Sequence, residues 1–265
     1  MLKDITVGQY YPVNSFIHKL DAKTKLIGTF IFMISLFIVN KFFVYSLVLL
    51  FLLSVIKLSN IPFSFIMKGL KPLKFIIIFT FIINMFFLPG EEIWSFGFLS
   101  ITKEGLNQAI FMAIRLVLLI VSTSMLTLTT SPMELTDGIE GLLNPLRKIG
   151  FPVHELAMMM TIALRFIPTL LEETDKIMKA QMSRGADFES KNLVNRVKNL
   201  VPLLIPLFIN AFRRADELSM AMEARCYRGG INRTKMKQSI ITKNDYISLS
   251  ILVIYFIVIL VFRFI

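Results

Sequence analysis

Two arginines, each placed where a predicted helix ends, are the side chains of this chain best suited to binding another molecule. The planar guanidinium group carries five N–H donors, which suit carboxylate or carbonyl oxygens in a groove of a partner. A cation in the last turn of a helix also interacts favourably with the helix dipole, so the spacing alone favours a structural role. The two sites comprise Ser183, Arg184 and Gly185, and Ala224, Arg225 and Cys226, with Arg228 before Gly229 and Gly230 as a further candidate.

Two long amphipathic helices are predicted to carry these arginines. The spacing of apolar residues predicts one helix over Val153–Ser183 and another over residues 193–225. Each could reach about 45 Å at a rise of 1.5 Å per residue. Pro168 in the first helix, and Pro202 with Pro206 in the second, should bend these helices or break them into shorter pieces.

A shorter helix is predicted just before the long ones. Ser131 and Glu134 read as a capping box with Pro132 at the first helical position, and this helix should end near Leu143. The long helices are apolar around much of their circumference near their starts, so we expect lipid or another protein to cover these parts. Methionine, which suits both an adaptable surface and a core gap, is frequent on them, at Met158, Met159, Met160, Met178, Met182, Met220 and Met222.

The remaining elements must anchor this region, and composition indicates a lipid bilayer as the anchor. Of the 265 residues, 55% are hydrophobic and 25 are Phe, which is too apolar for an ordinary soluble domain. Crossing the hydrocarbon takes about 20 apolar residues, with a minimum of about 17. We expect about five spans, around residues 26–39, 42–56, 73–88, 106–128 and 247–262. The first two are read as a tight hairpin in which Asp21 caps the first helix, with a single kinked helix as the alternative.

The distribution of charge predicts the orientation in the membrane. Most of the 29 Lys and Arg lie in residues 1–25, 57–74 and 130–243, which a five-span arrangement places on one face. The positive-inside rule makes that face cytoplasmic, together with the N-terminus. The net charge of +11 is explained by this topology better than by nucleic-acid binding, because acidic residues alternate with the basic ones and aromatic residues do not. Some juxtamembrane lysines could also meet anionic lipid headgroups.

These patterns divide the chain into a membrane region with four spans (1–130), a cytoplasmic coupling-helix region (131–243) and a C-terminal span (244–265). The predicted fold class is an all-α integral membrane protein. Over most of its length the chain resembles the transmembrane T component of energy-coupling factor (ECF) transporters, a branch of the ATP-driven importers. The residues that carry the resemblance are 18–21, 25, 129–132, 150–152, 165–168, 183–187 and 221–230.

The resemblance implies a non-catalytic subunit of the cytoplasmic membrane of a prokaryote. Its partners would be two ABC-type ATPase subunits and one or more substrate-binding membrane S components, and its cargo vitamins or other micronutrients. Arg184 and Arg225 would be the centres of paired Ala-Arg-Gly-like motifs, each docking into one ATPase. Ser183 and Cys226 depart from that pattern, in which Ala and Gly are common. The resemblance implies neither a cofactor nor a metal.

Alternative functions and one unexplained residue remain open at this level. Within the family, a dedicated cobalt or nickel importer is the alternative to vitamin uptake. An intramembrane enzyme would need converging catalytic groups, for which His154, Glu155 and Arg165 near the interface are the available residues. Two distant histidines and the single Cys226 favour neither a metal cluster nor an internal disulfide. Arg115, inside the fourth span, could snorkel, pair with a backbone carbonyl or contact a partner.

Overall fold

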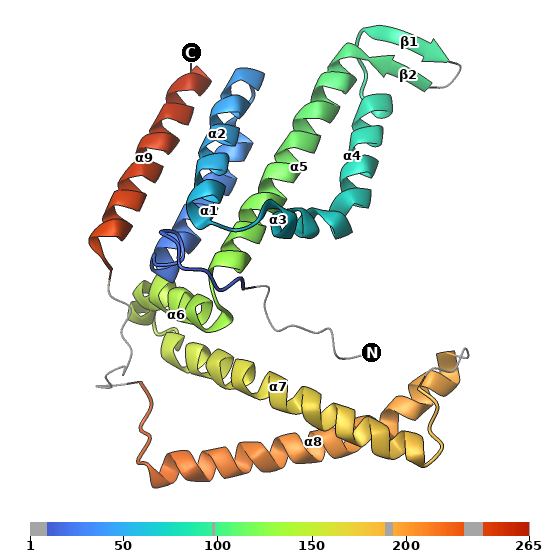
Figure 1. Ribbon diagram of the computed structural model, residues 1–265, viewed down its shortest axis with the longest axis vertical. Coiled ribbons are helices and arrows are strands. Elements are labelled where there is room, and N and C mark those ends of the chain that lie inside the picture. Colours follow the sequence, from blue (N-terminus) through green and yellow to red (C-terminus); the bar gives the residue numbers. More distant parts are fainter. Residues whose placement is uncertain (1–9, 97–98, 189–192, 231–240, 265) are drawn as a thin grey trace. The chain divides into compact units, whose positions relative to one another are not determined.

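The computed structural model describes residues 10–96, 99–188, 193–230 and 241–264 (Figure 1). Helices dominate this part of the chain, which confirms the predicted all-α class. A small antiparallel hairpin is the exception. The elements are α1 (Ala22–Ile38), α2 (Phe42–Ser59), α3 (Phe63–Leu70), η1 (Lys71–Leu73), α4 (Lys74–Phe87), β1 (Glu92–Phe96), β2 (Leu99–Thr102), α5 (Lys103–Thr129), α6 (Pro132–Leu143), η2 (Asn144–Ile149), α7 (Val153–Ser183), α8 (Leu193–Ala224) and α9 (Lys243–Phe264).

The chain forms two compact units. The first, here called the membrane unit, consists of Gly8–Gly138 together with Ser239–Ile265. The second, here called the crossed-helix unit, contains Ile139–Gln238. Helix α6 begins in the membrane unit and ends in the crossed-helix unit.

The first two apolar stretches are two antiparallel helices, as the hairpin interpretation predicted. Helix α1 ends at Ile38 and α2 starts at Phe42. The chain then runs back along α1, so that the ring centroids of Phe32 and Phe51 are 6.0 Å apart. Asp21 caps α1 by accepting the backbone N–H of Lys23 at 3.3 Å, which confirms the predicted N-cap.

Helix α5 is central to the membrane unit, where it contacts α1, α2, α3 and α4, while α9 packs along α1. Leu36, Val48 and Ile259, from α1, α2 and α9, are fully buried in the shared core. The hydroxyls of Ser35 and Tyr255 lie 3.1 Å apart and join α1 to α9 inside this core. The spans are therefore held by interdigitated apolar side chains and a polar bridge between helices.

Five helical segments within the described residues are long and apolar enough to cross a membrane. They are Phe42–Ser59, Phe63–Phe87, Lys103–Thr129, Val153–Ser183 and Lys243–Arg263. This confirms about five such helices, but the set differs from the predicted spans. Helix α1, with 17 residues, is shorter than all five of these segments. Helix α7, which was not among the predicted spans, belongs to this set and has the lowest mean hydropathy of the five, 1.2.

The connection between α4 and α5, which contains Glu91 and Glu92, includes a β-hairpin. Strands β1 and β2 pair antiparallel, with Ser95 opposite Ser100 and Phe96 opposite Leu99. Next to the hairpin, the Glu104 carboxylate accepts the backbone N–H of Glu91 at 2.8 Å. Thr102 caps the start of α5 by accepting the N–H of Gly105 at 3.0 Å.

Arg115 bonds within the membrane unit, and of the three roles left open the pairing with a backbone carbonyl is observed. Its Nη2 donates to the carbonyl of Val39 at 3.3 Å, and its Nε donates to the Tyr45 hydroxyl at 3.2 Å. The guanidinium also lies 5.5 Å from the ring centroid of Phe37. Val39 follows the last residue of α1, so Arg115 binds a carbonyl that this helix end leaves without an intrahelical donor.

Candidate functional site

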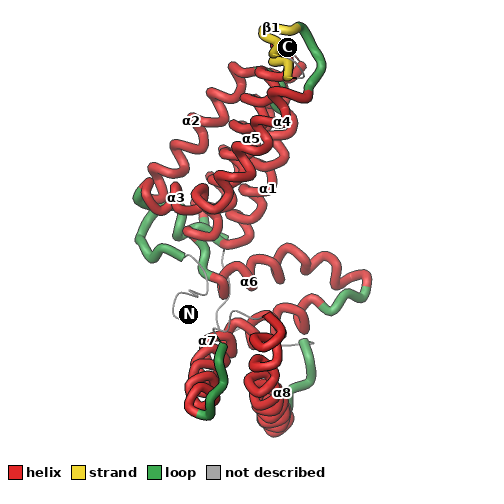
Figure 2. Tube along the Cα trace, turned by 90° about the vertical axis from the view of Figure 1, so that its right-hand side faces the viewer, coloured by secondary structure: helices red, strands yellow, loops and turns green. Residues whose placement is uncertain are grey.

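Helices α7 and α8, which carry the two candidate arginines, cross as an antiparallel pair. They cross in Figure 1 and lie alongside each other in the perpendicular view of Figure 2. Glu173 on α7 accepts a hydrogen bond from the Asn210 amide at 2.5 Å and lies 3.5 Å from the guanidinium of Arg214. Further along α7, the Gln181 amide donates to the carbonyl of Pro202 at 3.5 Å. The antiparallel order places the C-terminal ends of α7 and α8 on opposite sides of the crossing.

Both helices have nearly the predicted bounds. Helix α7 spans Val153–Ser183 as predicted, and α8 ends at Ala224, one residue before the predicted end. Neither helix is broken at its prolines, although α8 changes direction in its first part (Figure 1). The preceding capping box is also confirmed, because Ser131 and Glu134 exchange hydrogen bonds of 3.3 Å in both directions.

Arg184 is the C-cap residue of α7. Gly185 follows with a positive φ of 91° and donates its N–H to the carbonyl of Met182 at 3.0 Å. Ala186 donates to the carbonyl of Gln181, also at 3.0 Å. This pair of bonds is a Schellman motif, which ends the helix and satisfies its terminal carbonyls through the backbone alone. Because the backbone closes the helix end, the exposed Arg184 side chain is not needed to cap it.

Arg225 ends α8 with the same arrangement. Cys226 has a φ of 55° and donates its N–H to the carbonyl of Glu223 at 2.8 Å. Tyr227 donates to the carbonyl of Met222 at 3.0 Å. The arginine is again an exposed C-cap residue followed by a left-handed residue, so the two helix ends present their arginines in the same local geometry.

The neighbouring candidate residues are also exposed, and the end of α8 agrees with the prediction. Ser183 and Ala224 are exposed at the last turns of their helices, and Arg228 is exposed in the segment that follows α8. The predicted end of the second long helix is confirmed within one residue, because α8 ends at Ala224 and Cys226 adopts the left-handed conformation that is usual for a glycine after a helix end. The glycines Gly229 and Gly230, which also read as a helix stop, lie beyond this end.

The apolar stripe of α8 has little cover within the described residues. Leu204, Phe208 and Phe212 are 43%, 60% and 69% exposed. Met159, Met182 and Met220 are also exposed on α7 and α8. An apolar surface of this extent marks a site for another protein or for lipid.

The residues proposed for an enzyme lie apart along α7, because Arg165 follows His154 and Glu155 by ten or more positions, about 15 Å along the helix. His154 Nδ1 lies 3.3 Å from the Glu140 carboxylate, a pair that joins α6 to α7. Arg165 is exposed on α7. In the part of the chain that the structure describes, no group of three or more His, Cys, Asp and Glu side chains is placed to hold a metal ion.

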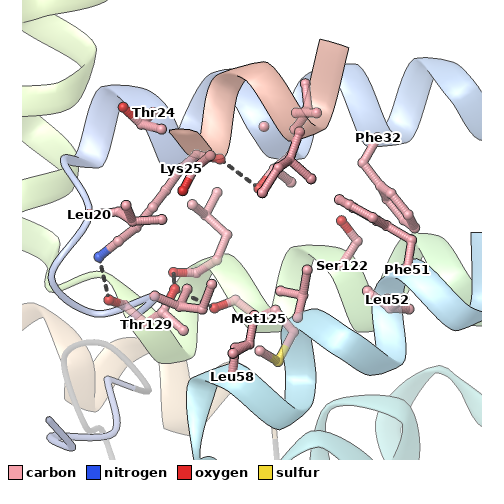
Figure 3. A pocket seen from close by; sticks show the side chains of 18 of the residues that line it. Leu20, Thr24, Lys25, Phe32, Phe51, Leu52, Leu58, Ser122, Met125 and Thr129 are labelled. Carbon is pink, nitrogen blue, oxygen red and sulfur yellow. Dashed lines mark hydrogen bonds between the residues drawn. The ribbon is translucent and has the colours of Figure 1, made fainter. Parts of the chain in front are cut away.

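Lys25, on the first turn of α1, joins α1 to the end of α5. The Lys25 ammonium donates to the carbonyl of Thr129 at 2.9 Å and to that of His18 at 3.0 Å. Figure 3 shows Lys25 and Thr129 at one end of an apolar cavity of about 290 Å³, with Phe32 and Phe51 at the other. Lys25 thus binds the terminal carbonyl of α5, where a cation is favourable. In the sequence, residue 25 contributed to the family resemblance, but no local pattern indicated its contact with Thr129.

Asp245 at the start of α9 was missed, although a sequence signal for it exists. Its carboxylate accepts the backbone N–H of Thr242 at 2.7 Å and the backbone N–H of Asp21 at 2.8 Å. Asp245 therefore joins the start of α9 to the start of α1 and is fully buried. Thr242 and Asp245 have the three-residue spacing of a capping box, which could have predicted the start of the helix.

Comparison with known proteins identifies the family of this membrane protein. Residues 13–236 match the CbiQ family, described as cobalt transport protein. The chain therefore belongs to the CbiQ cobalt transport protein family.

Individual relatives are named energy-coupling factor transporter transmembrane protein EcfT, which confirms the resemblance found in the sequence. The chain is 60% identical over 255 residues to the protein of Ruminiclostridium cellulolyticum, covering 96% of both chains. It is 60% identical over 244 residues to that of Thermosediminibacter oceani, covering 92% of both. It is 52% identical over 246 residues to that of Bacillus subtilis, covering 92% of this chain and 93% of the relative.

Proposed function

We propose that this chain is the energy-coupling transmembrane component of an ECF-type importer of vitamins or other micronutrients. Arg184 and Arg225 each dock onto one of two ATPase subunits. The observation that carries the proposal is the repeated geometry of the two helix ends, in which an exposed arginine caps the helix and a left-handed residue follows it. The names of the relatives support the same assignment.

The crossing of α7 and α8 suits an attachment to two separate subunits. Eleven residues separate Glu173 from Arg184, and fifteen separate Asn210 from Arg225. At a rise of 1.5 Å per residue, the two arms extend about 16 Å and about 22 Å from the crossing, in opposite directions. Each arginine can therefore enter a different protein, where its guanidinium would bind carboxylate or carbonyl groups.

In this proposal the partner subunits bind and hydrolyse ATP, and this chain performs no catalysis. Its sequence contains no glycine-rich phosphate loop of the Walker type. Closure of the ATPases on ATP would move the two grooves and with them the two arginines. The bridge from Glu173 to Asn210 and Arg214 would make α7 and α8 move together.

The exposed apolar faces would pass this motion to a membrane S component that binds the substrate. Leu204, Phe208 and Phe212 supply a continuous stripe along α8, and methionines on both helices can repack against different S components. The coupling region, residues 131–243, would lie on the cytoplasmic side, as would the N-terminus. The membrane would be the cytoplasmic membrane of a prokaryote.

Charge reversal at the two helix ends tests the docking role. Arg184→Glu combined with Arg225→Glu should abolish co-purification with both ATPases while the chain stays inserted in the membrane. Each single change should weaken the complex by at least tenfold, because a carboxylate would face the groups that bound the guanidinium. Arg165→Glu with Arg213→Glu is the matched control, since both residues are exposed on the same two helices away from their ends. Equal loss of the ATPases in the control, or no loss in the test variant, would contradict the proposal.

A dedicated cobalt or nickel importer is the second candidate, favoured by the description of the family that the chain matches. The two candidates differ in the number of S components that one T component serves. Affinity purification of the native complex, followed by identification of the co-purified membrane proteins, separates them. Several S components indicate a shared vitamin importer, and a single metal-binding partner indicates a dedicated one.

A further inference from the structure

A group of lysines in the membrane unit has no acidic neighbour along the sequence. No Asp or Glu occurs between Asp21 and Glu91, whereas Lys68, Lys71 and Lys74 follow one another at intervals of three residues. All three lysine side chains are exposed. Their charges are therefore not neutralised by nearby carboxylates of the same segment.

Local structure places the three lysines around the start of α4. Lys68 lies in the last turn of α3, Lys71 begins η1 and Lys74 begins α4. Helix α3 is pressed onto α5 through Gly69, where an added Cβ would lie 2.5 Å from the Ser124 hydroxyl oxygen. This close approach fixes the lysine-bearing segment beside α5.

The lysines line one end of a groove that continues onto apolar side chains. The groove has a volume of about 470 Å³ and is lined by Lys68, Lys71 and Lys74 together with Ile77, Ile78 and Val117. Ile77 and Ile78 belong to α4, and Val117 belongs to α5, which is long and apolar enough to cross the bilayer. A cationic end and an apolar continuation thus occur in one groove.

We propose that this groove binds an anionic phospholipid, with its phosphate at the three lysines and an acyl chain along Ile77, Ile78 and Val117. Charge complementarity favours an anion, because three exposed lysines that line one groove follow one another in a segment that contains no Asp or Glu. The apolar continuation favours a lipid over a soluble anion, because hydrocarbon gains by leaving water for such a surface. Basic pockets at the ends of membrane helices bind anionic headgroups in this way.

The test uses the full-length chain in nanodiscs that contain phosphatidylcholine and phosphatidylglycerol, with retained lipids measured by native mass spectrometry. K68Q/K71Q/K74Q should lower phosphatidylglycerol retention by at least tenfold, because the bound phosphate would lose all three ammonium groups that line its groove. K68R/K71R/K74R should keep retention close to that of the wild type. The matched control is K19Q/K57Q/K243Q, which removes the same charge from exposed lysines at the starts of α1 and α9 and the end of α2, and it should leave retention within twofold.

A second pair of variants tests the acyl-chain part of the groove. Ile78 lines the groove and is 46% exposed, whereas Ile82, one turn further along α4, does not line it and is 45% exposed. Ile78→Trp should fill the groove and lower retention severalfold, and Ile82→Trp should not.

Three results would overturn the proposal. They are an equal loss in the control triple variant, full retention in the lysine-to-glutamine variant, and displacement of the lipid by millimolar inorganic phosphate. The last result would assign the lysines to a free anion. The experiment contains no ATPase, so its failure leaves the proposed coupling function untouched, and loss of ATPase docking leaves the lipid site untouched.

Discussion

Cys226 occupies, just after the end of α8, the position that Gly185 occupies just after the end of α7. Each follows the arginine that caps its helix, with φ angles of 55° and 91°, and each donates its N–H to a carbonyl of the last helical turn. A side chain in this left-handed region costs about 1 kcal/mol or more, because Cβ crowds the following carbonyl. The end of α8 therefore carries a strain that the end of α7 avoids.

Replacing Cys226 by glycine should stabilise the end of α8. Cys226→Gly removes the Cβ and should raise the free energy of opening this turn by about 1 kcal/mol, which slows amide hydrogen exchange at Tyr227 about fivefold. Gly185→Ala should have the opposite effect at Ala186, because nothing lies within 4 Å of an added Cβ and only the backbone is strained. Cys226→Ser keeps the Cβ and should leave the amide exchange rate at Tyr227 unchanged. Faster exchange in Cys226→Gly would refute the strain argument.

Glu173 should hold the crossed helices together. Glu173→Ala leaves the Asn210 amide and the Arg214 guanidinium without their shared acceptor, so we expect a loss of about 1 kcal/mol, which allows for partial exposure of the pair. Thermal unfolding of Glu173→Ala, Asn210→Ala and the double variant measures the coupling. Effects that add without any interaction term would show that the two side chains do not act together.

Lys25 should contribute strongly to the stability of the membrane unit. Lys25→Met removes the donor to the carbonyls of Thr129 and His18, and each buried carbonyl left unpaired costs about 1–3 kcal/mol. We expect the unfolding midpoint in detergent to fall by several degrees, which is the shift that a loss of this size produces. Lys23→Met, also on α1, is the control and should leave the midpoint close to that of the wild type.

His18 should make stability depend on pH. Burial lowers the pKa of His18 below its ordinary value of 6.5, and the ring contacts the Tyr11 carbonyl at 3.0 Å and the Ser15 hydroxyl at 2.7 Å. The unfolded chain therefore takes up a proton at this residue before the folded chain does. Its stabilising contribution is complete above pH 6.5 and decreases as the pH falls from 6.5 towards the lower pKa of the folded state.

His18→Gln tests this pH dependence directly. The variant removes the titrating ring, so its unfolding midpoint should change less between pH 7 and pH 5 than that of the wild type. Equal pH dependence in the two proteins would assign the effect to other groups.

Local signals in the sequence predicted most elements of the fold. Ser131 and Glu134 predicted the start of α6, and apolar periodicity predicted the bounds of α7, because these features depend on neighbours along the chain. The contacts of Lys25 with Thr129 and of Glu173 with Asn210 could not be predicted in this way. They join residues 104 and 37 positions apart, and only the packing of helices brings them together.

The sequence was also informative at the candidate site, with one limit. It placed Arg184 and Arg225 at helix ends, but it could not show that Cys226 reproduces the backbone of Gly185. The left-handed region is rare for cysteine, so residue type alone argues against it there.

Site-specific photo-crosslinking next to the two arginines tests the central claim most directly. A photoreactive residue at position 183 or 224 leaves Arg184 and Arg225 intact, and one at exposed Glu91, beside the hairpin, serves as control. In the assembled transporter, positions 183 and 224 should each crosslink to an ATPase subunit, and the control position should not. Crosslinks from both positions to lipid alone, with the ATPases attached elsewhere on the chain, would contradict the account.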